Sequence, residues 1–157
     1  MTPVVRPAEP ADAVQLARLH TASFADGWDD VYFSGWLARE TSFAVIAASG
    51  TGRDCEAVAF GLALAAGDDA ELLTIASLPD ARRSGWGRKI FRALDRAAER
   101  RGLRRWVLEV ARNNAPARGL YESEGFVEIA VRKGYYPQPG GAVDAIVMAR
   151  PVSGIPG

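Results

Sequence analysis

The stretch from Leu72 to Gly102 constrains the fold of this chain more than any other. It opens with an apolar run rich in β-forming residues, which stops at Pro79. A short loop of arginine and glycine follows. Beyond the loop, apolar residues recur at helical spacing, at Ile90, Phe91, Leu94, Ala97 and Ala98. The stretch therefore predicts a strand, an anion-binding loop and a helix in direct succession.

The loop has the composition of a phosphate site. Gly85 and Gly87 permit positive φ and leave no Cβ between the main chain and a ligand. The helix that follows adds unpaired N–H groups and the positive end of its dipole, and Arg82, Arg83 and Arg88 add full charges. A solvated turn is the alternative explanation. The loop lacks the Gly-Lys-Ser/Thr ending of a Walker sequence and the third glycine of a dinucleotide fingerprint, so an ordinary nucleotide fold is not predicted.

Length and composition restrict the class of protein. A chain of 157 residues fits one domain, here residues 1–151, with a loose tail at 152–157 that carries proline, glycine and serine. The net charge of zero disfavours a general nucleic-acid binder. No apolar run approaches the roughly 20 residues needed to span a bilayer, and the N-terminus lacks the blocks of a signal peptide. We therefore expect a cytoplasmic protein without a membrane partner.

Cys55 and His20 are the single cysteine and the single histidine. One cysteine cannot form an internal disulfide, which fits a reducing compartment. A Cys/His catalytic pair is the alternative, but neither residue lies in a nucleophile motif, so packing roles are favoured for both. No cluster of His, Cys and Asp has metal-ligand spacing, and no metal is predicted.

The N-terminal half predicts short strands and two helices. Strands are expected at residues 4–6, 43–47 and 57–65, and helices at 12–24 and 32–37. The aromatic residues of the two helices either border a groove or lie in the core, and the core is favoured. Gly67-Asp68 signals a tight turn, so three consecutive strands ending with the one that contains Ile75 are predicted to be antiparallel.

The C-terminal half predicts three further strands and one further helix. The helix after the loop ends at Gly102, a glycine C-cap, and the strand at 106–110 is a candidate parallel neighbour of the strand that contains Ile75. Asn114 can cap the next helix, which closes at Gly125-Phe126. Two last strands, 126–131 and 142–149, are expected around a loop that contains Tyr135-Tyr136-Pro137.

Two side chains are candidates for chemistry. Glu109 stands between Leu108 and Val110 in a strand that otherwise reads as buried, and a carboxylate there must be hydrogen-bonded or open to a cleft. A glutamate facing water is the alternative. Tyr121 lies in the helix that Asn114 caps, and its alternative role is that of a core tyrosine.

These elements together resemble a known family. Arg82-x-x-Gly85-x-Gly87 between a strand and a helix resembles the acyl-CoA signature of the GNAT N-acetyltransferases. The chain from about Leu72 to Met148 is similar to the RimI-type branch of that family, the ribosomal-protein-alanine N-acetyltransferases. The similar segments are Leu108-Glu109-Val110, Asn114-Ala115-Pro116-Ala117-Arg118-x-Leu120-Tyr121-Glu122, Gly125-Phe126, Arg132-x-x-Tyr135-Tyr136-Pro137 and Asp144-Ala145-Ile146-Val147-Met148.

The resemblance implies a fold and a set of site residues. The fold is α/β, with a mixed, mostly antiparallel sheet of about seven strands flanked by about four helices and a central parallel strand pair. Glu109 would accept a proton from the substrate amine, and Tyr121 would protonate the departing thiolate. Tyr135 and Tyr136 would shape a peptide groove. Acetyl-CoA would be bound by main-chain groups of Ile75, Ala76 and Ser77 at the pantetheine arm, by those of Arg83, Ser84, Gly85, Trp86, Gly87 and Arg88 at the pyrophosphate, and by the Asn114 side chain.

The implied activity is acetyl transfer from acetyl-CoA to the N-terminal α-amine of a protein, with alanine of a small-subunit ribosomal protein as the acceptor. The protein would act as a monomer or weak dimer. Three departures from the branch concern the acceptor: Arg112 is displaced by one position, Gly134 replaces a frequent asparagine, and Val143 occupies a position that is often acidic. Transfer to a small-molecule amine or a lysine is therefore the first alternative, and a non-catalytic acyl-CoA-binding module is the second.

Overall fold

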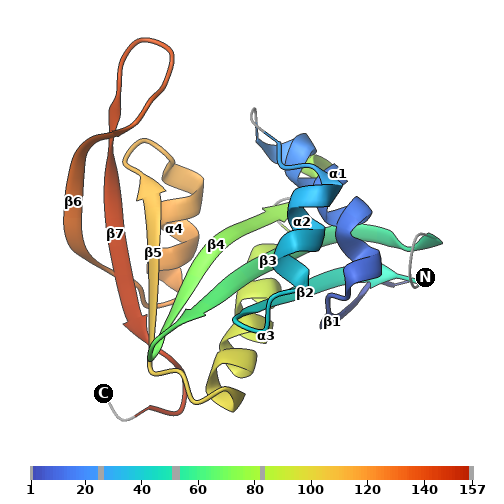
Figure 1. Ribbon diagram of the computed structural model, residues 1–157. Coiled ribbons are helices and arrows are strands. Elements are labelled where there is room, and N and C mark those ends of the chain that lie inside the picture. Colours follow the sequence, from blue (N-terminus) through green and yellow to red (C-terminus); the bar gives the residue numbers. More distant parts are fainter. Residues whose placement is uncertain (1, 25–26, 51–53, 82–83, 156–157) are drawn as a thin grey trace.

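The computed structural model describes residues 2–24, 27–50, 54–81 and 84–155. Seven strands form one sheet in the order β1-β2-β3-β4-β5-β7-β6 (Figure 1). The strands are β1 (Val4–Pro7), β2 (Ser42–Ser49), β3 (Glu56–Ala66), β4 (Asp69–Ser77), β5 (Arg105–Ala111), β6 (Val127–Tyr136) and β7 (Val143–Pro151). The α-helices are α1 (Ala13–Ser23), α2 (Asp30–Leu37), α3 (Trp86–Arg100) and α4 (Ala115–Ser123).

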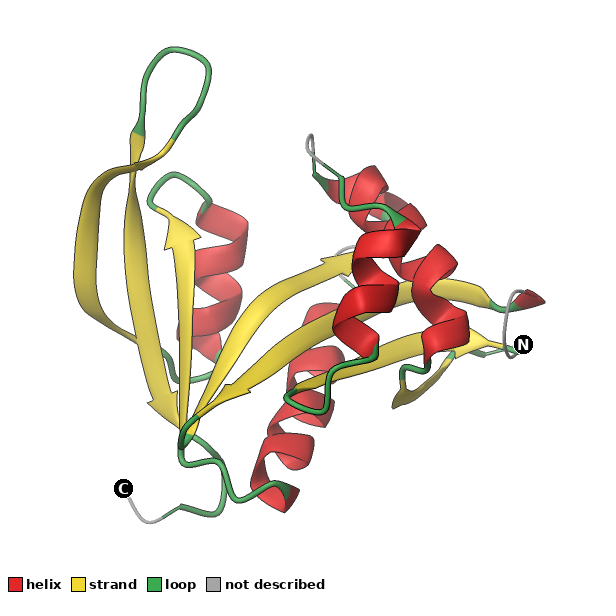
Figure 2. Ribbon diagram, viewed as in Figure 1, coloured by secondary structure: helices red, strands yellow, loops and turns green. Residues whose placement is uncertain are grey.

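Helices cover both faces of the sheet, with α1 and α2 on one face and α3 and α4 on the other (Figure 2). Each face has its own apolar core. Residues of α1 and α2 such as Leu16 and Phe33 pack with Phe60 of β3, whereas Phe91 of α3 packs against Trp106 of β5 on the opposite face. The alternation of side chains along each strand divides the apolar residues between the two layers. None of the described helices is long and apolar enough to cross a membrane.

Most of the expected elements are confirmed. Strands β2, β3 and β4 run antiparallel in sequence, and β5 is the parallel neighbour of β4. The end of α3 has the expected glycine cap, because Gly102 has a φ of +73° and the Leu103 N–H donates to Ala98 O at 3.0 Å. The predicted α/β sheet with a parallel pair is therefore the observed fold.

The parallel pairing between β4 and β5 is short, and this allows the two strands to separate. Strands β4 and β5 are paired only from Asp69 with Arg105 to Glu71 with Val107. Beyond these residues the two strands diverge, as Figure 1 shows. In β4 the register against β3 shifts around Leu73, which inserts one extra residue as a bulge and strengthens the local twist. The C-terminal ends of β4 and β5 are thus spread apart.

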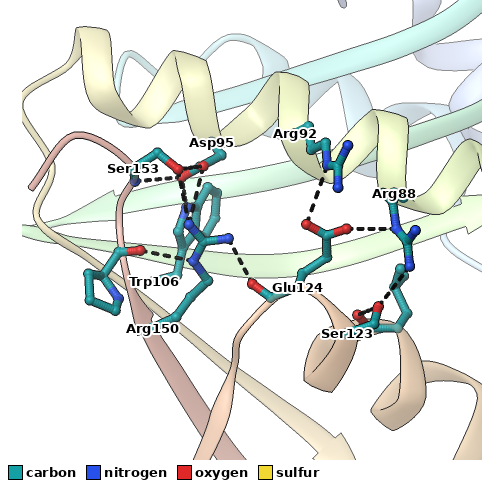
Figure 3. A network of polar contacts seen from close by, with 10 residues as sticks. Arg88, Arg92, Asp95, Trp106, Ser123, Glu124, Arg150 and Ser153 are labelled. Atoms are coloured by element: carbon teal, nitrogen blue, oxygen red, sulfur yellow. Dashed lines mark hydrogen bonds and ion pairs between the residues drawn. The ribbon is translucent and has the colours of Figure 1, made fainter. Parts of the chain in front are cut away.

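The final segment differs from the expectation of a loose tail at 152–157. Val152 is 1% exposed, and the Ser153 N–H donates to Asp95 Oδ1 at 3.1 Å. Asp95 is itself buried in α3 and accepts a 2.9 Å hydrogen bond from Trp106 Nε1, while Arg150 reaches the same carboxylate (Figure 3). A buried carboxylate needs these donors, and the tail supplies one of them. Residues 152–155 are therefore packed on the domain, and residues 156–157 lie outside the described part.

The tyrosine pair also differs from the expectation, because Tyr135 and Tyr136 belong to β6 and not to a loop. Gly134 has a φ of +60°, and its N–H donates to Asp144 Oδ1 at 2.9 Å. The register against β7 shifts here, after which Tyr136 pairs with Val143. The glycine at positive φ absorbs the irregularity, so the strand continues through the tyrosines.

Candidate active site

The spread ends of β4 and β5 leave main-chain groups without a strand partner. No ladder pairing joins Ile75, Ala76 or Ser77 to β5, although the other edge of β4 stays paired with β3. Nearby, the Thr74 hydroxyl is buried and has no hydrogen-bond partner within the described ranges. Buried polar groups are normally satisfied, so this edge fits the amides of an extended ligand such as a pantetheine arm.

The N-terminus of α3 offers a second set of free donors. Gly85 is the N-cap residue in the left-handed conformation, with a φ of +79°, and no side chain caps the helix. The first helical bond runs from the Lys89 N–H to Gly85 O at 3.1 Å, so the amides of Trp86, Gly87 and Arg88 precede the hydrogen-bonded ladder. These amides and the dipole of a 15-residue helix suit a pyrophosphate. Arg82 and Arg83 lie outside the described residues.

Glycine at position 87 is also needed for helix packing, which the sequence alone did not indicate. A Cβ at this position would lie 3.1 Å from Cδ2 of Leu120, a residue of α4. At Gly85 a Cβ would meet no heavy atom within 4 Å, so there the positive φ is the constraint. One glycine therefore shapes the loop, and the other lets α3 and α4 approach closely.

The Arg88 side chain, expected to add its charge to the loop, forms an ion pair in the structure. Its Nε lies 2.8 Å from Glu124 Oε1, and its Nη2 donates to Ser123 Oγ at 3.1 Å. Figure 3 shows the guanidinium directed at the end of α4. The Arg88 charge is thus shared with a buried glutamate, the C-cap residue of α4, and its attraction for a phosphate stays a prediction. The expected role of the Arg88 main-chain N–H is unaffected.

Asn114 is the N-cap of α4, as predicted. Its Oδ1 accepts a hydrogen bond from the Ala117 N–H at 3.3 Å, and Pro116 lies in the first turn. The contact of this side chain with the coenzyme stays a prediction.

Glu109 projects from β5 on the face opposite the core that contains Leu108 and Val110. Its side chain is 28% exposed, and its Oε1 lies 3.0 Å from Arg132 Nε on β6. The carboxylate lines a pocket of about 230 Å³ at the base of the spread strands. The pocket is lined by Ala66, Asp69, Glu71, Arg105, Val107, Leu108, Glu109, Arg132 and Val147. Glu109 is therefore open to a pocket, as a catalytic carboxylate must be.

Tyr121 is buried in α4, with its ring 5.7 Å from that of Phe126. Burial raises the pKa of its phenol to about 12, and the nearby Tyr136 phenol contributes in the same direction. Tyr121 therefore remains protonated at neutral pH and can donate a proton. The alternative role of Tyr121 as a core residue is also supported, because its ring belongs to the apolar core.

Tyr136 connects these groups electrostatically. Burial raises the pKa of its phenol, and the charges of Glu109 and Tyr135 raise it further, while Arg132 opposes them. Tyr135 is half exposed, and the Arg132 guanidinium carbon lies 5.2 Å from the centre of its ring. Tyr136 thus interacts electrostatically with both Glu109 and Tyr121, although Glu109 lies on the face of β5 opposite the core that contains Tyr121. Arg132 contacts two of the predicted site residues, although the sequence analysis gave it no role.

His20 and Cys55 have the packing roles that were favoured. Both are buried. The Trp28 N–H donates to His20 Nδ1 at 3.0 Å, and the two rings stack at 4.5 Å. Burial lowers the pKa of His20 and raises the pKa of the Cys55 thiol. Among the described residues, no group of three or more His, Cys, Asp or Glu side chains could hold a metal ion.

The structure thus combines a mixed sheet, a parallel strand pair that spreads apart and a helix N-terminus that no side chain caps. The sequence profile of the Acetyltransferase (GNAT) family matches residues 13–126, and the chain belongs to this family.

Several individual members of this family are similar to the chain in sequence or in structure. The solved structure of the ribosomal-protein-S18-alanine N-acetyltransferase from Escherichia coli superimposes with a TM-score of 0.85 at 32% identity, covering 99% of this chain and 96% of that one. The curated [ribosomal protein bS18]-alanine N-acetyltransferase of Escherichia coli (strain K12) is 44% identical over 95 residues, which are 60% of this chain and 64% of the relative's length. Arabidopsis thaliana NAA60 in complex with acetyl-CoA shares the fold, with a TM-score of 0.81 at 18% identity over 98% of this chain and 100% of that one.

Proposed function

We propose that this protein transfers the acetyl group of acetyl-CoA to the N-terminal α-amine of a protein, with alanine of a small-subunit ribosomal protein as the acceptor. The observation that supports this most is the arrangement of Glu109 on β5 opposite the unpaired edge of β4. One strand offers a proton acceptor at a pocket, and the other offers main-chain groups to a coenzyme. The E. coli relatives named after bS18 alanine acetylation support the choice of acceptor.

The chain's own groups would hold the coenzyme in two places. Main-chain groups of Ile75, Ala76 and Ser77 would bond the pantetheine arm, and the amides at the start of α3 would hold the pyrophosphate. Acetyl-CoA, when bound, supplies the acetyl group as a thioester. Because these contacts are mostly main-chain, they hold the ligand in a fixed direction without adding net charge.

Glu109 would accept the proton that the amine loses. An amine attacks a thioester only when neutral. An α-amine with a pKa near 7.8 is neutral roughly a tenth of the time at pH 7, whereas a lysine at about 10.4 is neutral only a few times in ten thousand. A single carboxylate therefore suffices more readily for an N-terminus than for a lysine.

Tyr121 would donate a proton to the leaving thiolate. A thiol pKa near 8.5 makes the thiolate a moderate leaving group, so an unactivated phenol can assist. The Tyr121 phenol is protonated at neutral pH, and its raised pKa makes it a weaker acid than an ordinary tyrosine. Tyr135 and Tyr136, on β6 and separated from the strand of Glu109 by β7, would border the groove for the acceptor peptide. We further propose that the protein acts in the cytoplasm as a monomer or weak dimer.

An ion pair formed by Arg112 favours a second class of acceptor, a small-molecule amine or a lysine. Arg112, displaced by one position from the branch pattern, has its Nε 3.3 Å from Asp144 Oδ2. An arginine engaged in this way is less available to a peptide carbonyl or carboxylate. This favours a small-molecule amine or a lysine as the alternative acceptor. A module that only binds acyl-CoA would need neither Glu109 at a pocket nor a protonated Tyr121.

A panel of acceptors tests the proposal. The protein is mixed with acetyl-CoA and, separately, with a peptide that has a free N-terminal alanine, an N-blocked peptide with one lysine, and a small diamine. Release of free thiol is followed in each mixture. We expect release with the first peptide alone. Faster release with the lysine or the diamine favours the alternative acceptor, and binding of acetyl-CoA without release in any mixture favours the binding module.

A further inference from the structure

Arg132 contacts both the carboxylate of Glu109 and the ring of Tyr135. In the sheet, Glu109 pairs with Val147 of β7, and Arg132 pairs with Ala145 two residues earlier on the same strand. The two side chains therefore meet across β7, over a separation of two strand spacings, or roughly 10 Å. Alanine at position 145 leaves room for the long arginine side chain to cross.

The geometry of this pair leaves Glu109 able to act. The contact joins Arg132 Nε to Glu109 Oε1 at 3.0 Å. Glu109 still lines the pocket, so the ion pair does not remove its carboxylate from the site. The arginine side chain is 54% exposed and the glutamate side chain 28%. An ion pair so open to solvent is weak, so it orients the carboxylate without sequestering it.

We infer that Arg132 is a positioning residue for acetyl transfer, which holds the Glu109 carboxylate toward the acceptor amine. This inference rests on the proposed function. The guanidinium acts in two ways. It fixes one oxygen of the base, which reduces the number of unproductive rotamers. It also places a positive charge beside the acceptor, which favours the neutral amine over the ammonium form.

The contact with Tyr135 extends the same role. An arginine over an aromatic face is held by the negative charge of the ring face, so Tyr135 limits where the guanidinium can go. Tyr135 thus supports Arg132, which in turn orients Glu109. A peptide that contacts Tyr135 would therefore affect the position of Arg132 and, through Arg132, the orientation of Glu109.

A double-mutant cycle tests the inference on the intact protein with an N-terminal alanine peptide. We expect Arg132→Gln to lower kcat by about 10- to 100-fold while the KM for acetyl-CoA stays the same. Arg132→Lys should recover most of the loss. In a Glu109→Gln background, adding Arg132→Gln should change kcat by less than about 2-fold, because the partner is already absent. A merely structural arginine would give additive losses and a lower melting temperature.

Arg96→Gln is the control, since Arg96 is also an exposed arginine but lies on α3, which packs on the other face of the sheet. It should leave kcat unchanged. If the wild type acetylates no acceptor, the proposed function is overturned and the role of Arg132 falls with it. If the wild type is active and Arg132→Gln matches it, or the losses are additive in the cycle, this inference alone is overturned.

Discussion

Arg88 Nε lies 2.8 Å from Glu124 Oε1, and this contact joins the first turn of α3 to the residue that ends α4. The Glu124 side chain is only 7% exposed and also receives Arg92 Nε at 3.5 Å. The helix that begins at the coenzyme loop and the helix that contains Tyr121 are therefore held together by one buried carboxylate (Figure 3). The start of α3 and the helix that contains Tyr121 are thus positioned as a unit.

Replacing Glu124 with alanine should weaken this unit. The substitution leaves two arginines without their shared partner, so the free energy of unfolding should fall by about 1–3 kcal/mol. Urea denaturation at pH 7 measures the change. Glu122→Ala is the control, because Glu122 is exposed and its nearest cation, Arg118, is 3.9 Å away. Equal free energies of unfolding for the two variants would show that the contact between Arg88 and Glu124 does not stabilise the protein.

Glu109→Gln should remove the proton acceptor while keeping the shape of the side chain. We expect kcat to fall by about 10²- to 10⁴-fold, the range that general bases contribute, with unchanged affinity for acetyl-CoA. Steady-state kinetics and calorimetric titration measure the two quantities. Glu128→Gln, at an exposed glutamate of β6, should behave as the wild type. Loss of acetyl-CoA binding in Glu109→Gln would assign this residue to the coenzyme site instead.

Tyr121→Phe should lower kcat, by about 10- to 100-fold, with acetyl-CoA affinity retained. The same variant tests the raised pKa. The folded pKa of about 12 exceeds the ordinary value of 10.0, so the stabilising effect of the protonated phenol is complete below pH 10 and is lost as pH rises through 12. Absorbance titration should show one tyrosine ionising near pH 12, and Tyr121→Phe should remove it. Removal of that ionisation by Tyr32→Phe, at an exposed tyrosine, would contradict the assignment.

Local patterns predicted most of the fold. Apolar periodicity located the strands and α3, and side-chain or glycine caps located helix ends, as at Asn114 and Gly102. Glu109 stood out because a carboxylate among buried neighbours needs a reason. These features depend on residues close together in the chain, so sequence alone contains them.

Features that depend on distant segments could not be predicted. The pairing of Arg132 with Glu109 requires the register of three strands, and the packing reason for Gly87 requires the approach of α4. The tail was expected to be loose because its composition is that of a linker. It is fixed by a buried carboxylate at Asp95, almost 60 residues away in sequence.

Asp12 gives the protein a pH-dependent source of stability. Its carboxylate is bonded by both terminal nitrogens of Arg6, at 2.8 and 2.9 Å, and by the Glu9 N–H at 2.7 Å. Burial raises the Asp12 pKa, but these bonds outweigh burial, and the pKa is lowered from its ordinary value of 3.8. The stabilisation is therefore complete above pH 3.8 and is lost as pH falls through the lower, folded value.

Asp12→Asn should reduce the free energy of unfolding at pH 7 by about 2–4 kcal/mol, since Arg6 loses its charged partner. Urea midpoints at pH 7 and at pH 2 measure the loss, and the difference between variant and wild type should shrink at the lower pH. Asp30→Asn, at an exposed position of α2, is the control. A difference that stays constant with pH would exclude ionisation of Asp12 as its cause.

The central claim is that this site acetylates an N-terminal α-amine, and competition within one molecule tests it most directly. A peptide with a free N-terminal alanine and one internal lysine is incubated with the protein and acetyl-CoA, and tandem mass spectrometry locates the acetyl group. The account predicts acetylation of the alanine α-amine, with the lysine unmodified and with the product strongly reduced in Glu109→Gln. Acetylation of the lysine, or equal product from Glu109→Gln, would contradict it.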